Sequence, residues 1–200
     1  GLNRQTWLTK YIRPLEQKIL SADFVEDGAK LAISEMIKSG TTCYADMYFF
    51  PNVSAAIARE IGVRSQIGFP VFDDSSGRSA DSYIHEGLKL YDSCKNQLLT
   101  KIAFAIDSLN TLDSETLSLI ATYANELDLP IRILLHENAS EKPFSVNRFG
   151  SRPLERLIEL GILQPQTQLA HMIKIDAHDI RLLKNNGCHI IACPESNLKL

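Results

Sequence analysis

The sequence predicts an α/β protein built on a parallel sheet, and two observations lead to this fold class. Short apolar β-type runs alternate with helical patterns over most of the chain, as in right-handed βαβ units. The apolar runs are nearly continuous, which is typical of parallel strands that are covered on both faces. The composition agrees, because 44% hydrophobic and 22% charged residues in a chain of 200 residues describe one ordinary globular domain.

The first forty residues are predicted to form two leading helices. Apolar residues recur at helical spacing from Trp7 to Ile19 and again from Phe24 to Ile37. Ser21 is a suitable amino-terminal cap for the second helix, and Gly40 follows its end, where a left-handed residue is favoured. Pro14 is expected to kink or split the first helix.

From Thr41 onward, strands and helices are expected to alternate. The predicted strands are 41–46, 63–70, 101–106, 131–136, 167–171 and 188–192. The helices between them are predicted at about 52–61, 80–95, 113–127, 152–160 and 176–186. The connection 137–151 is rich in Asn, Ser, Lys, Pro and Gly, so we predict a mobile lid or a disordered loop there. Six strands are fewer than the eight of a closed barrel, so either the sheet is open or the chain is the middle of a longer polypeptide.

The fourth predicted strand ends in two ionisable residues, His136 and Glu137. Catalytic groups of parallel α/β proteins lie at the carboxyl ends of the strands, because the loops there form the concave face. This strand end is therefore the first candidate site. The alternative is a solvated His-Glu pair that only caps a strand.

Composition argues against several classes of partner. The net charge of −3 and the pI near 6.0 provide no general attraction to nucleic acid. The apolar runs are too short to cross a bilayer, and the first residues lack the apolar centre of a signal peptide, so we expect a cytoplasmic protein. The four cysteines have no tight metal-binding spacing and are expected to be reduced, mostly buried thiols.

Several stretches, taken in order and at their spacing, resemble one family. These stretches are Thr6-Trp-Leu, Ser39-Gly-Thr-Thr-Cys43-Tyr-Ala-Asp46-Met-Tyr-Phe-Phe-Pro51, Leu127-Asp-Leu-Pro-Ile131, Leu135-His-Glu137, Arg152-Pro-Leu, Ala170-His171-Met and Cys193-Pro-Glu-Ser-Asn-Leu-Lys-Leu200. They are similar to the metal-dependent amidohydrolases of the 5′-methylthioadenosine/S-adenosylhomocysteine deaminase and s-triazine (atrazine/ethylammeline) chlorohydrolase group. The resemblance covers almost the whole chain.

The resemblance implies a (β/α)8 barrel of the TIM type, of which this chain is a central fragment. The six predicted strands would be barrel strands two to seven, with helices outside. Residues 1–200 would then form a single incomplete barrel domain, with the leading helices at 1–40 and six βα-type units at 41–200. This assignment explains why only six strands are visible.

The resemblance also implies a set of catalytic and metal-binding residues. In such enzymes Zn or Fe is held by a His-x-His on the first strand, a His on the fifth, usually a His on the sixth and an Asp on the eighth. Glu137 matches the position that shuttles protons, and His171 matches the histidine of the sixth strand, so both are catalytic candidates and His171 is also a metal candidate. The position of the fifth-strand ligand is Leu134, which cannot bind a cation. His136 shares strand parity with Leu134 and is the candidate replacement ligand if the strand stays regular.

Two further residues are predicted to contact substrate. Asp107 stands where the family carries a substrate-contacting His, and Asn197 belongs to the matching stretch after the last predicted strand. Purely structural roles are the alternative for these candidate positions. Glu137 could pair with a loop donor, His171 could be a satisfied buried histidine, and Asp107 could cap a strand.

Taken together, the sequence indicates a hydrolase that deaminates or dechlorinates a purine-like or triazine-like heterocycle, a small-molecule substrate. The first and eighth barrel strands are not among these 200 residues, so we expect this chain alone to bind no metal and to be inactive. The alternative is a non-catalytic relative or fragment that acts as a binding or assembly scaffold. An open arc of six strands leaves edges unpaired, which predicts self-association.

Overall fold

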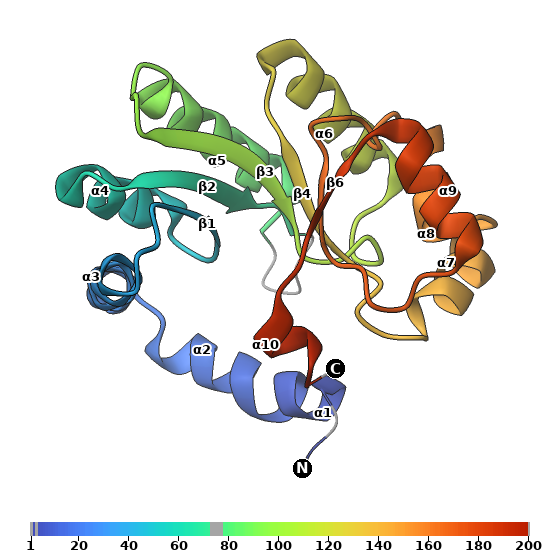
Figure 1. The fold of residues 1–200 in the computed structure, drawn as a ribbon, viewed down its shortest axis with the longest axis horizontal. Helices are drawn as coiled ribbons and strands as arrows, with labels where there is room; N and C mark the ends of the chain where they lie inside the picture. The colour runs from blue at the N-terminus through green and yellow to red at the C-terminus, as the bar shows by residue number, and fades with distance from the viewer. Residues whose placement is uncertain (1, 3, 73–77, 200) are drawn as a thin grey trace. The chain divides into compact units, whose positions relative to one another are not determined.

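The computed structural model describes residues 2, 4–72 and 78–199 (Figure 1). The chain divides into two compact units, one made of Gly1–Ile67 and Asn96–Lys101 and the other of Gly68–Lys95 and Ile102–Leu200. Strands β2 (Arg64–Pro70) and β3 (Thr100–Ile106) each contribute residues to both units. The expectation of a single barrel domain over residues 1–200 stays a prediction.

The first unit begins with the predicted helices. These are α1 (Arg4–Trp7), a π-helical turn (Leu8–Ile12), α2 (Arg13–Ile19) and α3 (Ala22–Lys38). Pro14 lies in the first turn of α2, where a missing N–H costs little. The helical backbone continues without a break from Arg4 to Ile19, so Pro14 does not split the first helix, and a kink there stays a prediction. The Ser21 hydroxyl accepts a hydrogen bond of 3.1 Å from Phe24 N, and Gly40 has φ 87° after the end of α3. Both predicted caps are therefore present.

The rest of the first unit contains β1 (Cys43–Met47) and α4 (Pro51–Ile61). Helices α3 and α4 pack together through a buried cluster of Ile33, Ile57, Ala58 and Val63. Large apolar side chains of the leading helices stay exposed, among them Trp7, Tyr11, Leu15 and Leu31.

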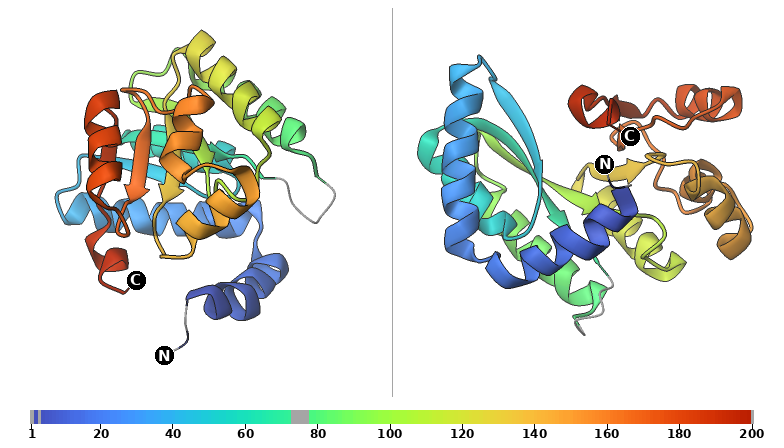
Figure 2. Two further views of the ribbon diagram at one scale, coloured as in Figure 1. Left: turned by 90° about the vertical axis from the view of Figure 1, so that its right-hand side faces the viewer. Right: turned by 90° about the horizontal axis from the view of Figure 1, so that it is seen from below.

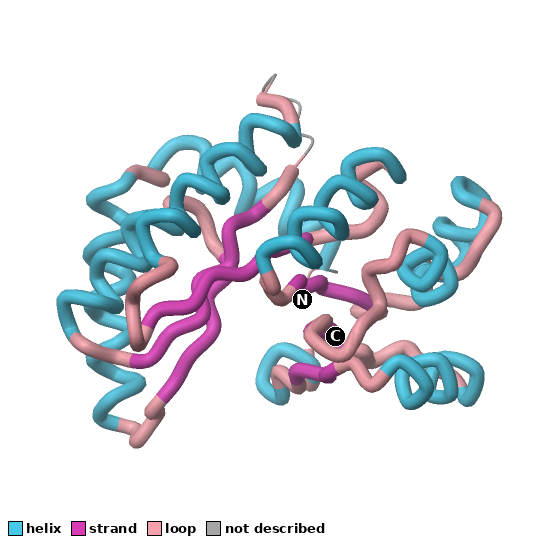
Figure 3. The backbone as a smooth tube through the Cα atoms, turned by 90° about the horizontal axis from the view of Figure 1, so that it is seen from above, coloured by secondary structure: helices cyan, strands magenta, loops and turns pink. Residues whose placement is uncertain are grey.

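Strands and helices alternate along the chain (Figure 3), and most of these elements belong to the second unit. Its further helices and strands are α5 (Ala80–Cys94), α6 (Ser114–Leu127), β4 (Ile131–Leu135), α7 (Glu141–Phe149), α8 (Pro153–Glu159), β5 (Gln168–His171), α9 (Ala177–Asn186), β6 (His189–Ile191) and α10 (Pro194–Asn197). The strand order is β1-β2-β3-β4-β5-β6, and β3 pairs with β4, β4 with β5 and β5 with β6, all in parallel. All six predicted strands are confirmed, in sequential order.

The prediction of a mobile or disordered connection at 137–151 is wrong, because α7 occupies Glu141–Phe149. Pro143 falls in the first turn of this helix, where proline is tolerated, and Gly150 ends it with φ 78°. Helix α7 packs beside α8, and α8 beside α9 (Figure 2). Residues 137–151 are therefore mostly an ordered helix.

The core of the second unit includes a close approach between a helix backbone and an aromatic ring. Phe69 of β2 and Phe104 of β3 are fully buried, with ring centroids 4.5 Å apart. A Cβ atom at Gly87 of α5 would lie 2.0 Å from Cδ2 of Phe69, so only glycine leaves room for the ring. Helix α5 therefore sits directly against the Phe69 ring.

The four cysteines are free, as predicted, but the expectation that most are buried is wrong. Cys94 is buried, Cys43 is exposed, and Cys188 and Cys193 are half-buried. Within the described ranges, no helix is both long enough and apolar enough to span a membrane.

Candidate functional site

The carboxyl ends of β4 and β5 lie side by side and leave their strands through unusual backbone conformations. Leu135 of β4 is in register with His171 of β5. His136, His171 and Met172 have left-handed φ values of 55°, 75° and 49°. Such values cost about 1 kcal/mol or more for a residue with a side chain, and they concentrate at functional sites. The two loops are joined by bonds from Met172 N to Leu135 O and from Ile173 N to His136 O, both 3.0 Å.

These strand ends bring three of the predicted site residues together. Nε2 of His171 lies 3.1 Å from Oε1 of Glu137, and its Nδ1 lies 2.8 Å from Oδ1 of Asn197 in α10. The His171 and Glu137 side chains are only 10% and 8% exposed. The imidazole is therefore held at both nitrogens, by a carboxylate on one side and an amide on the other. We call these three residues the Glu137–His171–Asn197 chain.

The His136 side chain does not follow the strand geometry that its predicted role as a replacement metal ligand requires. Strand β4 ends at Leu135, and the left-handed conformation of His136 breaks the strand alternation on which its role as a replacement ligand depended. Its side chain is fully buried, and neither ring nitrogen has a hydrogen-bond partner among the described residues. Burial lowers the pKa of His136 to about 4. The ring is neutral at pH 7, and ligation by His136 stays a prediction without support from strand parity.

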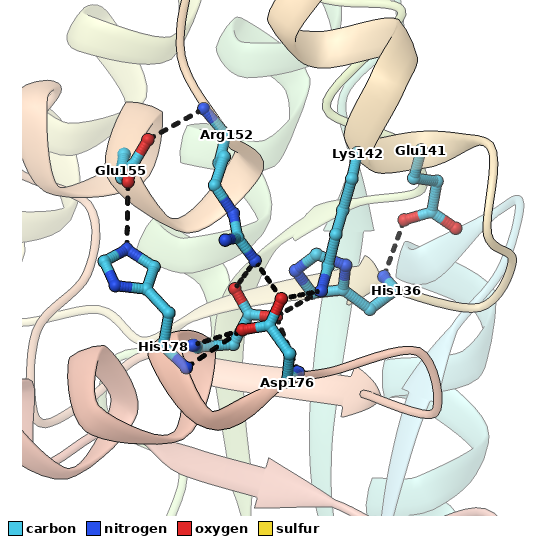
Figure 4. Close-up of polar contacts among 8 residues, drawn as sticks. His136, Glu141, Lys142, Arg152, Glu155, Asp176 and His178 are labelled. Carbon is cyan, nitrogen blue, oxygen red and sulfur yellow. Dashed lines mark hydrogen bonds and ion pairs between the residues drawn. The ribbon is translucent and has the colours of Figure 1, made fainter.

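The His136 ring is turned toward a cluster of ion pairs from the loops and helices after β4 and β5 (Figure 4). Asp179 of α9 is 1% exposed, and its carboxylate lies 2.5 Å from Lys142 Nζ and 2.8 Å from Arg152 Nη2. Asp176 lies 3.0 Å and 2.6 Å from the same two cations. The guanidinium of Arg152 is the largest cause that holds the pKa of Asp176 well below its usual range.

The segment formed by α7 and α8 (residues 141–159) is tied to the ends of two strands and to α9. Glu141 accepts hydrogen bonds from His136 N at 2.6 Å and from Asn138 N at 3.1 Å, which fixes the turn after β4. Glu155 lies 2.9 Å from Nε2 of His178 on α9 (Figure 4). Arg156 is 2% exposed and donates to Leu109 O at 2.8 Å in the loop after β3.

Asp107, the second predicted substrate contact, is not part of the Glu137–His171–Asn197 chain. It follows β3 and is half-buried, and no hydrogen bond or ion pair joins it to these three residues in the part of the chain that the structure describes. Asp107 begins the loop after β3, and Arg156 donates a hydrogen bond to Leu112 O in this loop. The Arg156 guanidinium also stacks on the Phe149 ring, with 3.5 Å between its Cζ and the ring centroid.

The residues present do not fit the metal centre that the resemblance implies. Leu134 of β4 offers an isobutyl group at the ligand position, and both nitrogens of His171 face other side chains. Over residues 2, 4–72 and 78–199, no three His, Cys, Asp or Glu side chains are grouped so that they could hold a metal ion. Catalytic zinc normally needs three protein ligands, which this part of the site does not supply.

Comparison with known proteins decides the family. The sequence profile of the amidohydrolase family matches residues 2–200. The chain belongs to the amidohydrolase family. Two relatives named 5-methylthioadenosine/S-adenosylhomocysteine deaminase are 46% identical over 196 residues (Saccharophagus degradans) and 44% identical over 198 residues (Teredinibacter turnerae). These alignments cover 97% and 98% of this chain but 44% and 45% of the relatives, so the chain spans less than half of their length.

Two solved structures agree with this assignment. A zinc-bound adenosine deaminase from Xanthomonas campestris is 35% identical, with a TM-score of 0.95 over 100% of this chain and 46% of that one. A zinc complex of atrazine chlorohydrolase from Arthrobacter aurescens has a TM-score of 0.89 over 99% of this chain and 49% of that one, and at 17% identity it supports the fold alone. The fold is thus that of a partial (β/α)8 amidohydrolase barrel, and the resemblance stated from the sequence is confirmed.

Sequence reasoning missed the ion-pair cluster around Asp179. One signal was available, because Asp176-x-x-Asp179 at the start of a predicted helix is a capping-box pattern, and the structure contains that box. The partner Lys142 lies in the segment 137–151 that was predicted to be mobile, and the partner Arg152 begins the helix predicted at about 152–160. The local sequence pattern therefore did not indicate that these two residues pair with Asp179.

Proposed function

We propose that the protein containing this chain is an amidohydrolase that deaminates or dechlorinates a purine-like or triazine-like heterocycle, and that this chain contributes the proton-transfer side of its site. The Glu137–His171–Asn197 chain carries the proposal, because it places a buried carboxylate and imidazole at two adjacent strand ends. The names of the relatives, which are deaminases, support the reaction class. The proposed location is the cytoplasm, which agrees with four free cysteines.

We further propose that the chain alone lacks the metal side of the site. Purified chain is expected to carry less than about 0.1 equivalent of tightly bound zinc, because no three-ligand site is present in its described residues. It is also expected not to deaminate adenosine or 5′-methylthioadenosine, since water has no metal to lower its pKa. Elemental analysis after dialysis and an ammonia-release assay measure the two quantities.

Two outcomes would contradict this proposal. The first is stoichiometric zinc that is lost in His171→Ala and kept in His189→Gln, a matched change of an exposed histidine on β6. The second is deaminase activity abolished by Glu137→Gln and kept in Glu195→Gln, a matched change of an exposed carboxylate in α10. Either result would mean that other groups of the chain complete the metal site.

Self-association is proposed as the second property of the chain. Strand β6 is last in the strand order, and Ile190 at its centre is 51% exposed. An apolar edge strand favours pairing with a second copy. Light scattering at tens of micromolar is expected to show a dimer or larger species, which Ile190→Lys reduces to the monomer. Ile180→Lys, on an equally exposed isoleucine of α9, is expected to leave the size unchanged. A monomeric parent chain would contradict the proposal.

A further inference from the structure

The loop after β3, residues 107–113, begins at the same edge of the sheet as the turn that carries Glu137. Strands β3 and β4 pair in parallel, with Ile106 in register with Ile133, so their carboxyl ends lie side by side. Asp107 is the first residue of the loop and is half-buried. A carboxylate accepts hydrogen bonds and does not donate them, so this position fits a heterocycle that offers an amino or ring N–H group.

The guanidinium of Arg156, on α8, binds this loop at several points. Its Nη1 donates to Leu109 O at 2.8 Å, and its Nη2 donates to Leu112 O at 3.1 Å and to Ser114 Oγ at 3.4 Å. The Arg156 side chain is 2% exposed, and all three oxygens that it binds are neutral. A buried charge is costly unless its donors are bonded, so the folded chain needs these loop oxygens in place.

The loop depends on Arg156 in return. The bonds from Arg156 to Leu109 O and Leu112 O are buried, so without their donor both carbonyls would lose their partner and the loop would have to turn them toward water. The planar guanidinium donates in two fixed directions at once, which the single ammonium of a lysine does not do. The Phe149 ring lies 3.5 Å from Cζ of Arg156 and fixes the plane of the guanidinium.

We propose that Arg156 is a positioning residue, which holds the loop 107–113 so that Asp107 binds an amino or ring N–H group of the heterocycle. Arg148 of α7 also donates to this loop, to Asn110 O at 3.2 Å, but it does so from an exposed position where water can replace it. The hold on the loop therefore comes from Arg156. The inference deepens the proposed function and rests on it for the contact between Asp107 and the substrate.

The first measurement is amide hydrogen exchange in the full chain. Asn110 N and Thr111 N donate to Ser108 inside the loop, so their exchange reports whether the loop keeps its conformation. In Arg156→Met, these two amides are expected to exchange at least about tenfold faster relative to the amides of β4, as the loss of a hydrogen bond to a charged group implies. Arg156→Lys leaves one carbonyl without a donor, and we expect a rise of the same order. Arg148→Met is the matched control and is expected to change the ratio less than about twofold, because its bond is exposed.

The second measurement reports on Asp107 itself. The chain is labelled with 13C at the aspartate carboxyl groups, the Asp107 signal is assigned by its loss in Asp107→Asn, and adenine is the probe because it is a purine with an amino group. In the parent chain and in Arg148→Met, adenine is expected to shift the Asp107 signal and to leave that of the exposed Asp92 unchanged. In both Arg156 variants the shift is expected to be lost while circular dichroism still shows the fold. A role of Arg156 in stability alone would leave the adenine response in place.

Three outcomes would overturn the inference. They are loop amides that exchange no faster relative to β4 in the Arg156 variants, an equal rise in Arg148→Met, and an Asp107 signal on which adenine acts no differently in the parent chain and in the Arg156 variants. If Arg156→Met does not fold, Arg156→Lys decides, since it keeps the charge and the apolar stem. Failure of the proposed function is seen separately, as deaminase activity or stoichiometric zinc in the isolated chain, and it leaves the exchange ratios unchanged.

Discussion

Replacing Asp179 with alanine is expected to destabilise the folded chain by about 3 kcal/mol, the low end of what breaking a buried ion pair costs. The Asp179 side chain is 1% exposed and accepts from both Lys142 and Arg152. Its loss leaves two cations with one carboxylate, Asp176, which is 48% exposed. Since the cations themselves are 22% and 26% exposed, water compensates part of the loss. Urea denaturation followed by circular dichroism measures the change.

Two variants show whether the charge or the location of Asp179 matters. Asp179→Asn keeps an acceptor for Asp176 N and removes the charge, so it isolates the electrostatic part of the loss. Asp92→Ala breaks an exposed pair with Lys95 on α5, and it should cost less than about 0.5 kcal/mol, as exposed pairs do. Equal losses in Asp179→Ala and Asp92→Ala would show that the cluster does not stabilise the fold.

Acidification is expected to destabilise the chain through His136 by about 2–3 kcal/mol between pH 7.5 and pH 4.5, from the shift between its two pKa values. The unfolded residue has an ordinary pKa of 6.5, while burial lowers the folded pKa to about 4. As the pH falls through 6.5, the unfolded state takes up a proton that the folded state does not bind until the pH is near 4. The lost stability is therefore fully present above pH 6.5 and declines below it.

The measurement compares the parent chain with His136→Asn by chemical denaturation at several pH values. Asparagine tolerates the left-handed φ of 55° at this position and does not titrate. Groups that titrate elsewhere contribute equally to both chains, so the difference in the free energy of unfolding isolates His136. A difference that does not vary with pH would show that the ring reaches water in the folded chain.

The sequence predicts the strands well and the connections poorly, for physical reasons. A parallel strand buried on both faces must be apolar throughout, so runs such as 131–135 are visible as strands without any tertiary information. Helix α7 buries only Ser145 of its nine residues, so it shows a mostly polar pattern that also fits a loop. Its order comes from contacts outside the segment, such as Lys142 with Asp179. Local patterns contain no record of those contacts.

The candidate site likewise contains residues that the sequence predicts and one feature that it does not predict. Glu137, His171 and Asn197 were identified from motif positions, and the structure places them in contact because β4 and β5 are adjacent and in register. The direction of the His136 side chain could not be predicted, because the sequence around this residue contains no signal for a left-handed backbone conformation. Strand parity assigned it to the pocket, and a single φ of 55° turned its ring toward Asp179.

The three left-handed residues at the ends of β4 and β5 have a consequence for attempts to make this chain more thermostable. Glycine at any of the three would relieve about 1 kcal/mol of backbone strain. At the buried His136 and Met172, however, loss of the side chain leaves a cavity that costs about 2–5 kcal/mol. A library selected only for heat resistance would therefore be enriched in glycine at the half-buried His171 alone. At His171 such a clone would have lost the imidazole that joins Glu137 to Asn197. Melting temperature is thus a misleading criterion at this edge of the sheet, and selection there has to include the state of the histidine.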